Sequence, residues 1–373
     1  MKNKPFYPNY NHSILGIPNF LLSYYGAKAT HPSLPILDGY LRQNYKNVIL
    51  IILDGMGMDM LQHNLSKFSF FRRHIKTKIS SVFPSTTVAA TTAYYSGLAP
   101  IEHGWLGWSP YFKDLDRVVE LYTNKDFYTG KRQRKNVTQK MSYPHICDKI
   151  SSANSTLHCT KVFPTFVDPD GPTDFKEFCF KIKQATLKKG SQFVLAYWFD
   201  PDHTSHEFGP YSKNVKAVLK DLNSKVKRLC SELKDSLVIV SADHGHIETQ
   251  DIFLNDYPDI MDCLAKPLSL DMRVQSVFLK PNKKKTFVRL FDQFFAKDFF
   301  LMKTEEALKM NLFGLGKMHP IAKGFFGDYL LIAKGGKNLV QRFPNDCYHV
   351  LKGSHSSLTT NEMLVPLIVI KKK

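Results

Sequence analysis

Three apolar runs that each end near an aspartate constrain the fold of this chain more than any other feature. The runs occupy residues 47–53, 193–199 and 237–241, and the aspartates that follow them are Asp54, Asp202 and Asp243. Unbroken apolar, β-branched runs of this length are typical of strands buried on both faces of a parallel sheet. Because ligand sites in open α/β sheets lie beyond the carboxyl ends of the strands, we expect the three carboxylates to meet at one edge of one sheet.

The remaining pattern predicts an α/β fold that is interrupted twice. Helical periodicity, clearest over residues 215–233, alternates with the apolar runs, and a fourth run closes the chain at residues 364–370. The first interruption, about residues 105–166, is interpreted as loops that cover the strand ends. We therefore predict an N-terminal arm, an α/β core and a smaller inserted subdomain. These parts span residues 1–45, residues 46–250 with 354–373, and residues 251–353, in that order.

Residues of metal-binding type follow two of the strands. Asp202 and His206 are four positions apart, so both side chains point the same way from one helical turn. An N-cap aspartate followed by a surface histidine would give the same pattern. Asp243 and His244 are adjacent, and Gly245 permits a turn sharp enough for both to converge, although an ordinary strand-ending turn is the alternative. A carboxylate combined with imidazole suits zinc or manganese.

Two further motifs are ambiguous when taken alone. Thr87 lies in a hydroxyl-rich segment that leads into a helix of small residues, where backbone N–H groups favour an anion. Plain capping of that helix by Ser85 or Thr86 is the competing interpretation. His355 stands in a Gly/Ser loop before the last strand, where a surface histidine would also fit.

In combination, these motifs resemble the alkaline phosphatase superfamily, and within it the type I phosphodiesterase/nucleotide pyrophosphatase family most closely. The likeness lies in the order of a strand ending in Asp, a hydroxyl helix, a PDxxxH turn, a DHG turn and a GxH loop before the last strand. It extends from about Val48 to Ile370. It implies an alkaline-phosphatase-like sandwich whose mostly parallel central sheet is flanked by helices, with a smaller inserted cap region and catalysis in the core.

The resemblance also implies a role for each matching residue. Thr87 would be the nucleophile that forms a phosphothreonine intermediate, and two divalent metal ions, usually zinc with manganese as the alternative, would assist it. One ion would be held by Asp202, His206 and His355, and the other by Asp54, Thr87, Asp243 and His244. The expected substrate is a small phosphorylated molecule, with nucleotides among the candidates, that is cleaved at a phosphodiester or phosphoanhydride bond.

Trp108 departs from the family pattern. The nucleotide pyrophosphatase branch carries at this position an Asn that donates to a phosphate oxygen, and an indole N–H does not mimic an amide closely. Trp108 is therefore interpreted either as a wall of the substrate site or as an aromatic residue buried under a loop. The departure keeps two alternatives open: a phosphomonoesterase or phosphonate hydrolase with the same two metals, and a basic anion-binding protein without turnover.

The charge and the cysteine content of the chain indicate which partners and which cellular location to expect. The chain has 51 Lys plus Arg against 33 Asp plus Glu, a formal charge of +18 that favours anionic partners, nucleic acid among them, unless it reflects scattered solvated lysines. No pair of the six cysteines has CxxC spacing, and neither a signal-peptide pattern nor an apolar run near the roughly 20 residues of a membrane span occurs. We therefore expect a cytoplasmic protein with free thiols and no membrane partner.

Overall fold

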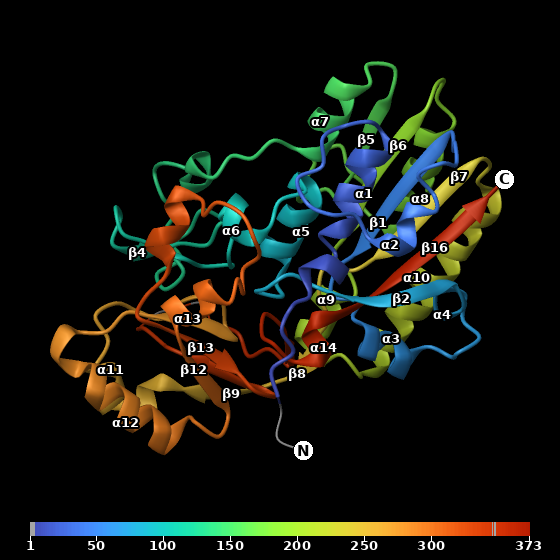
Figure 1. Cartoon of the computed structure of the whole chain (residues 1–373). Coiled ribbons are helices and arrows are strands. Elements are labelled where there is room, and N and C mark those ends of the chain that lie inside the picture. Colours follow the sequence, from blue (N-terminus) through green and yellow to red (C-terminus); the bar gives the residue numbers. More distant parts are fainter. Residues whose placement is uncertain (1–3, 345, 347) are drawn as a thin grey trace.

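A computed structural model describes residues 4–344, 346 and 348–373, and places a large α/β unit beside a smaller second sheet (Figure 1). The large unit is built on a six-stranded sheet in the order β2-β16-β7-β1-β6-β5. In that order, the strands are β2 (Ile75–Ser80), β16 (Leu364–Lys372), β7 (Ser236–Ser241), β1 (Asn47–Leu53), β6 (Gln192–Trp198) and β5 (His158–Val162).

The strands β7, β1, β6 and β5 are parallel, and β16 joins β7 antiparallel at one side. Every residue of β1, β6 and β7 is buried, which is why their sequences are unbroken apolar runs. The register aligns Leu53 of β1 with Trp198 of β6, and Ile52 with Ser241 of β7, so the three strands end at the same level.

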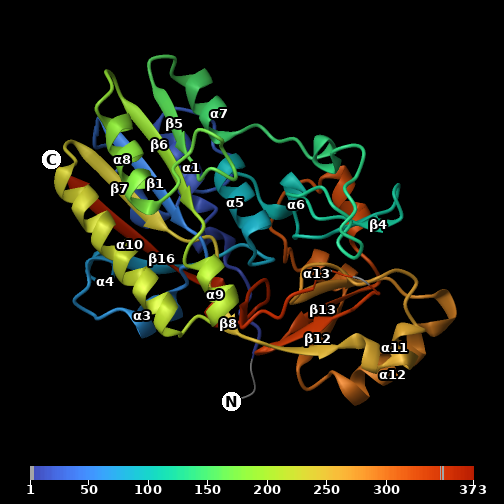
Figure 2. The same ribbon diagram turned by 180° about the vertical axis from the view of Figure 1, so that it is seen from behind.

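Helices cover both faces of this sheet, as Figures 1 and 2 show from opposite sides. One face carries α1 (Gly16–Tyr24), α5 (Thr87–Ser96) and α7 (Ile146–Ala153), and the other α3 (Met58–Asn64), α4 (Phe70–His74), α8 (Phe175–Thr186) and α10 (Lys213–Glu232). In α10 the buried residues recur every three to four positions, from Val215 to Leu229, as expected for a helix with one face on a sheet. The predicted α/β fold with a mostly parallel, helix-flanked sheet is confirmed.

The second unit is an antiparallel sheet in the order β10-β11-β13-β12. Its strands are β10 (Ser269–Leu270), β11 (Val274–Val277), β13 (Tyr329–Ala333) and β12 (Phe299–Lys303), and its helices are α11 (Pro258–Met261), α12 (Lys284–Phe294) and α13 (Thr304–Lys309). A hydrophobic cluster of its own includes Phe287, Phe291 and Phe295, whereas Phe313 and Phe325 pack into the main core. The boundaries drawn from the sequence for the core and the inserted subdomain stay a prediction.

Short elements connect and cover the two units. They are α2 (Pro35–Asp38), α6 (Pro100–His103), β3 (Tyr111–Phe112), β4 (Arg117–Val118), α9 (Asp202–Phe208), β8 (Ile247–Glu248), β9 (Gln250–Phe253), β14 (Lys337–Val340), β15 (Gly353–Ser354) and α14 (Thr360–Met363). The segment before β1, predicted as an N-terminal arm with room for one short helix, contains α1, whose residues from Gly16 to Leu22 are buried against the core. Within the residues that the structure describes, no helix combines the length and the apolarity needed to cross a bilayer.

The structure contradicts the expectation that the cysteines are all free thiols. Cys147 in α7 and Cys159 in β5 form a disulfide, with their Cα atoms 5.7 Å apart, so the prediction of free thiols is wrong for this pair. The helix and the strand lie next to each other in the fold, which brings the two positions together although the sequence shows no CxxC motif. Cys179, Cys230 and Cys263 are free, and Cys347 lies outside the described residues. Because disulfides persist mainly in oxidising compartments, the pair lends no support to the cytoplasmic prediction.

Candidate metal centre

The carboxyl ends of β1, β6 and β7 bring the three predicted aspartates together. Asp54 directly follows β1, Asp202 begins α9 after β6, and Asp243 comes two residues after β7. The backbone N–H of Asp202 donates to the carbonyl of Asp54 at 3.0 Å, and the N–H of Gly55 donates to Oδ1 of Asp243 at 3.0 Å. Direct hydrogen bonds therefore join the three strand ends at one edge of the sheet.

Two glycines let these turns approach so closely. Gly55 has a φ of +70°, and a Cβ there would lie 2.9 Å from the Cα and Cβ of Asp202 and from Cδ2 of His246. A Cβ on Gly245 would lie 2.0 Å from the carbonyl oxygen of Asn361. Both positions thus exclude a larger residue, for conformational and steric reasons at the first and for steric reasons at the second.

The first cluster of ligand-type side chains consists of Asp54, Asp243 and His244, and we call it the deep group. All three residues are buried. Nε2 of His244 lies 3.2 Å from Oδ1 of Asp54 and 3.5 Å from Oδ2 of Asp243. Nδ1 of His244 donates to the carbonyl oxygen of Gly245 at 3.1 Å, which leaves Nε2 pointing at the carboxylates. Fixing one ring nitrogen on a backbone carbonyl in this way is typical of metal-binding histidines.

Thr87 stands at the first position of α5 and borders the deep group. Its hydroxyl lies 3.1 Å from Nε2 of His244 and 3.5 Å from Oδ1 of Asp54. The competing interpretation from the sequence was helix capping by Ser85 or Thr86. The hydroxyl of Ser85 instead donates to the carbonyl of Ser357 at 2.7 Å, and Thr86 makes no side-chain capping hydrogen bond. The amino end of α5 therefore keeps backbone N–H groups available beside Thr87, where an anion is favoured.

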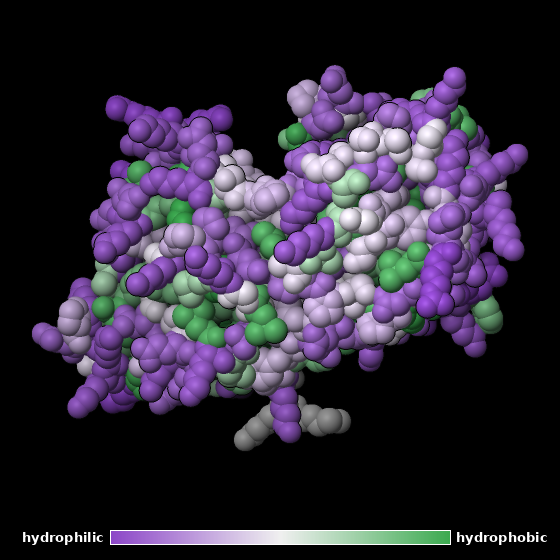
Figure 3. Space-filling view, turned by 45° about the horizontal axis from the view of Figure 1, so that its top comes forward, coloured by the Kyte–Doolittle hydropathy of each residue, from purple (hydrophilic) through white to green (hydrophobic). Residues whose placement is uncertain are grey.

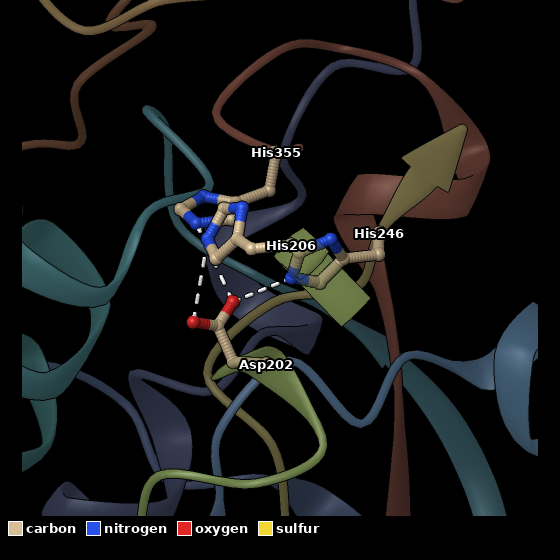
Figure 4. Close-up of side chains that lie close together, drawn as sticks. All are labelled: Asp202, His206, His246 and His355. Carbon is tan, nitrogen blue, oxygen red and sulfur yellow. Dashed lines mark hydrogen bonds and ion pairs between the residues drawn. The ribbon is translucent and has the colours of Figure 1, made fainter. Parts of the chain in front are cut away.

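The second cluster consists of Asp202, His206, His246 and His355, and we call it the outer group (Figure 4). Asp202 is its centre: Nε2 of His246 donates to Oδ1 at 2.5 Å, and Nε2 of His206 lies 3.4 Å from Oδ2. Nε2 of His355 lies 3.5 Å from Oδ1. Side chains from α9, from the segment after β7 and from the loop before β16 thus converge on one carboxylate.

Backbone carbonyls also orient the outer histidines. Nδ1 of His206 donates to the carbonyl of Gly353 at 2.8 Å, and Nδ1 of His355 donates to the carbonyl of Ser85 at 3.2 Å. The rings of His355 and His244 stack with centroids 3.7 Å apart, so the outer and deep groups are direct neighbours. Two cation sites side by side are the arrangement that clamps a phosphoryl group.

The charges of the deep group favour the binding of a cation. Burial, followed by the neighbouring Asp243 and Asp202, raises the pKa of Asp54 well above its usual range. Burial lowers the pKa of His244, but the surrounding carboxylates outweigh burial and raise it to about 10. Oδ2 of Asp243 is buried without a hydrogen-bond partner in the described part of the chain. A buried carboxylate oxygen without a hydrogen bond is costly, and a divalent ion held by these oxygen and imidazole ligands would satisfy it.

Two residues near the site were missed in the sequence. His246 lies two positions beyond His244, and the alternation Asp-His-Gly-His was the signal that could have revealed it. Its side chain is fully buried, and its Nδ1 has no hydrogen-bond partner among the described residues. Tyr197, near the end of β6, donates its hydroxyl to Oδ2 of Asp54, an interaction that only the register of β1 and β6 reveals.

Trp108, the residue that departs from the family pattern, lies outside both groups. Its backbone N–H donates to Oδ2 of Asp271 at 3.3 Å, and its ring meets Tyr122 edge-on with centroids 5.5 Å apart. The hydroxyls of Tyr122 and Thr91 lie 3.2 Å apart, and Thr91 donates to the carbonyl of Thr87 at 2.7 Å. Trp108 is half-buried and borders a cavity, and its role as a wall of the substrate site stays a prediction.

The chain is similar to a known protein family and to several of its members. The family model for type I phosphodiesterase / nucleotide pyrophosphatase matches residues 48–306. The chain is 25% identical over 235 residues to bis(5'-adenosyl)-triphosphatase enpp4 of Xenopus laevis, covering 56% of this chain and 50% of that protein. It is 23% identical over 241 residues to human ectonucleotide pyrophosphatase/phosphodiesterase family member 5, covering 60% and 49%. The chain thus spans about half the length of these sequence relatives.

Solved structures show the same fold. Human ectonucleotide pyrophosphatase / phosphodiesterase 5 superposes with a TM-score of 0.62 at 18% identity, covering 86% of this chain and 87% of that one. The murine protein superposes with a TM-score of 0.60 at 18% identity over the same shares of the two chains. An inactive variant of the murine protein, solved in complex with AMP, gives the same values.

Proposed function

Because the chain belongs to the type I phosphodiesterase/nucleotide pyrophosphatase family, within the alkaline phosphatase superfamily, we propose that it hydrolyses a phosphodiester or phosphoanhydride with Thr87 as nucleophile. The observation that carries the proposal is the placement of the Thr87 hydroxyl, 3.1 Å from His244 and 3.5 Å from Asp54, at the open end of a helix. Thr87 is itself partly exposed, whereas the deep group beneath it is buried. This partial exposure supports access of a substrate to the hydroxyl.

Two divalent ions are part of the proposal. Asp54, Thr87, Asp243 and His244 would hold one, and Asp202, His206 and His355 the other. When bound, the ions lower the pKa of a coordinated hydroxyl and offset the charge of the phosphoryl oxygens. Zinc fits the carboxylate and imidazole ligands best, and manganese is the alternative.

The chain's own groups account for the remaining chemistry. Thr87 Oγ1 attacks phosphorus, the bond to the leaving oxygen breaks in line with the attack, and the leaving group departs with the electron pair. The free N–H groups at the start of α5 favour the charge on the phosphoryl oxygens during this step. Water then attacks the phosphothreonine, which releases the phosphoryl group and restores the hydroxyl. The substrate would be a small phosphorylated molecule, and the nucleotide names of the relatives keep nucleotides among the candidates.

A panel of chromogenic substrates tests the proposal. Bis-p-nitrophenyl phosphate, the p-nitrophenyl ester of thymidine monophosphate and p-nitrophenyl phosphate are compared with zinc or manganese added. We expect the diesters to be cleaved faster than the monoester. Preference for the monoester would favour the phosphomonoesterase alternative, and no hydrolysis with either metal would favour the anion-binding protein.

The nucleophile has a separate test. We expect Thr87→Ala to abolish turnover, because the attacking oxygen is gone, and Thr87→Ser to retain part of it. Acid quenching of wild-type protein during turnover should trap a phosphorylated peptide that contains Thr87, and mass spectrometry would locate it. Full activity of Thr87→Ala would exclude Thr87 as the nucleophile.

A further inference from the structure

The segment that leads from β2 into α5 ends directly before Thr87, and we call its residues 81–86 the nucleophile turn. Hydrogen bonds hold this turn against both metal groups. The hydroxyl of Ser81 donates to the carbonyl of Asp243 at 2.5 Å, and the carbonyl of Ser85 accepts from an outer histidine at 3.2 Å. The position of the nucleophile therefore depends on how firmly this turn is held.

Tyr10, in the segment before α1, binds the same turn from outside the metal centre. Its hydroxyl accepts from the backbone N–H of Phe83 at 3.3 Å and donates to the carbonyl of Leu312, in the loop after α13, at 2.9 Å. Burial raises the pKa of Tyr10, so the hydroxyl keeps its proton and can donate and accept at the same time. One oxygen atom thus connects the nucleophile turn with a loop that lies far along the chain.

The loop after α13 packs closely against Tyr10 and against the turn. Gly314 has a φ of +94°, and a Cβ there would lie 3.2 Å from Cε1 of Tyr10 and 2.5 Å from Cβ of Ala99, so a larger residue does not fit beside the ring. The rings of Phe83 and Phe313 lie with their centroids 5.4 Å apart. Packing therefore fixes the ring of Tyr10, and its hydroxyl adds the polar contact between the two segments.

The segment that carries Tyr10 is hydrogen-bonded to the core on both sides of this residue. The N–H of Phe6 donates at 2.7 Å to the carbonyl of Leu358, in the loop that carries an outer histidine. The N–H of Ile14 donates at 2.8 Å to the carbonyl of Ser80, at the end of β2. Tyr10 therefore lies between two fixed points, as a residue that holds another segment in place must.

A contact of this kind matters because the second unit is not joined to the core along its whole side. Figure 3 shows the surface hollowed between the two lobes of the molecule, so the lobes are joined over only part of their width. The loop after α13 is one of the connections, because Leu312 and Phe313 pack into the main core. Through Tyr10, the position of this loop bears on the position of the nucleophile turn.

We propose that Tyr10 is a positioning residue, whose hydroxyl fixes the backbone of Phe83 and so holds the hydroxyl of Thr87 in line for attack on phosphorus. The inference rests on the proposed function for the role of Thr87. It adds a residue of the N-terminal segment to those on which phosphoryl transfer depends. Because the Tyr10 hydroxyl binds backbone groups and not a metal ligand, its loss should slow the attack without weakening the binding of metal or substrate.

Steady-state hydrolysis of bis-p-nitrophenyl phosphate by zinc-loaded Tyr10→Phe tests this role. We expect kcat to fall about tenfold and KM to stay within about twofold of the wild-type value, since a misplaced nucleophile costs rate rather than ground-state binding. The zinc content, measured by elemental mass spectrometry, should equal that of the wild type. An unchanged kcat would overturn the inference, and so would a fall in kcat that is explained by loss of zinc.

Tyr25→Phe is the matched control. Tyr25 also belongs to the part of the chain before β1, and its hydroxyl also donates to a backbone carbonyl, that of Gln192, at 3.3 Å. Gln192 begins β6, at the end of the strand that points away from the metal centre. Each variant loses one hydrogen bond of a tyrosine hydroxyl, so both should lose a similar amount of stability, but only Tyr10→Phe should lose kcat. An equal loss of kcat in both would show that Tyr10 acts through stability alone.

Amide hydrogen exchange provides a measurement that does not depend on activity. Tyr10→Phe should speed exchange in a peptide that covers residues 81–88, because the N–H of Phe83 loses its acceptor and the turn opens more often, whereas Tyr25→Phe should not. Unchanged exchange in this peptide would overturn the inference whether or not the protein is active. Failure of wild-type protein to cleave any of the three chromogenic substrates would instead count against the proposed function.

Discussion

Arg273 of the second unit and Glu362 of the core form a fully buried bidentate ion pair. Nε of Arg273 donates to Oε1 of Glu362 at 2.7 Å and Nη2 donates to Oε2 at 2.9 Å, and neither side chain is exposed. Nη1 and Nη2 also donate to the carbonyls of Lys337 and Gly335. Oε1 of Glu362 accepts from the N–H of Ser357, two residues after His355. The pair therefore links the second sheet to the loop that carries an outer histidine.

Breaking this pair should destabilise the protein. Arg273→Met leaves the Glu362 carboxylate buried without its partner, and we expect the free energy of unfolding to fall by about 3–5 kcal/mol. Chemical denaturation followed by tryptophan fluorescence measures the change. Because the Glu362 carboxylate that accepts from the N–H of Ser357 is no longer held in place by Arg273, the affinity of the outer group for zinc should fall as well.

Two further variants serve as controls for that prediction. Lys225→Met breaks the exposed pair with Asp221 on α10 and should cost less than about 1 kcal/mol. Arg273→Met combined with Glu362→Leu removes both charges and should recover part of the lost stability. A double variant less stable than Arg273→Met alone would show that the cost comes from packing rather than from the stranded carboxylate.

The two groups should lose their metals independently. His355→Ala removes one imidazole from the outer group, and His244→Ala removes the only imidazole assigned to the deep group. We expect each variant to bind roughly one zinc ion per chain where the parent binds roughly two, since a site with three protein ligands tolerates the loss of one poorly. Elemental mass spectrometry after dialysis measures the content. Two ions retained in both variants would contradict the assignment of ligands.

The sequence predicts those parts of the site whose patterns are carried by residues close together along the chain. Asp54, Asp202 and Asp243 were predictable because unbroken apolar runs mark buried parallel strands, whose ends define the edge of the sheet. Thr87 and His355 were ambiguous alone, and only the order of the motifs singled them out. The contact between Asp271 and Trp108 joins residues 163 positions apart, and the pair Arg273–Glu362 joins residues 89 apart. No periodicity or spacing encodes contacts of that kind.

His246 should strengthen metal binding by the outer group through Asp202. Its Nε2–H holds Oδ1 of Asp202 at 2.5 Å, and we expect His246→Leu to weaken zinc binding at this group about 10- to 100-fold, as loss of an orienting partner does. His246→Gln, which keeps an N–H donor, should recover part of the affinity. Competition with a chromogenic chelator measures both variants.

His203 provides the control for His246. It lies on α9, between the ligands Asp202 and His206, but its side chain is exposed and belongs to neither group. His203→Gln should leave the affinity for zinc unchanged. If His246→Leu bound zinc as tightly as His203→Gln does, the hydrogen bond to Asp202 would have no part in holding the metal.

The disulfide between Cys147 and Cys159 should stabilise the folded protein. It closes a loop with a sequence separation of 12, and cross-links of that span stabilise folded proteins by about 3 kcal/mol in the chain-entropy account. Reduction, or Cys147→Ser with Cys159→Ser, should therefore lower the free energy of unfolding by about this amount. A peptide map without reductant should show the two cysteines in one linked fragment. Two unlinked, alkylated cysteines in protein purified under air would contradict the disulfide and restore the prediction of free thiols.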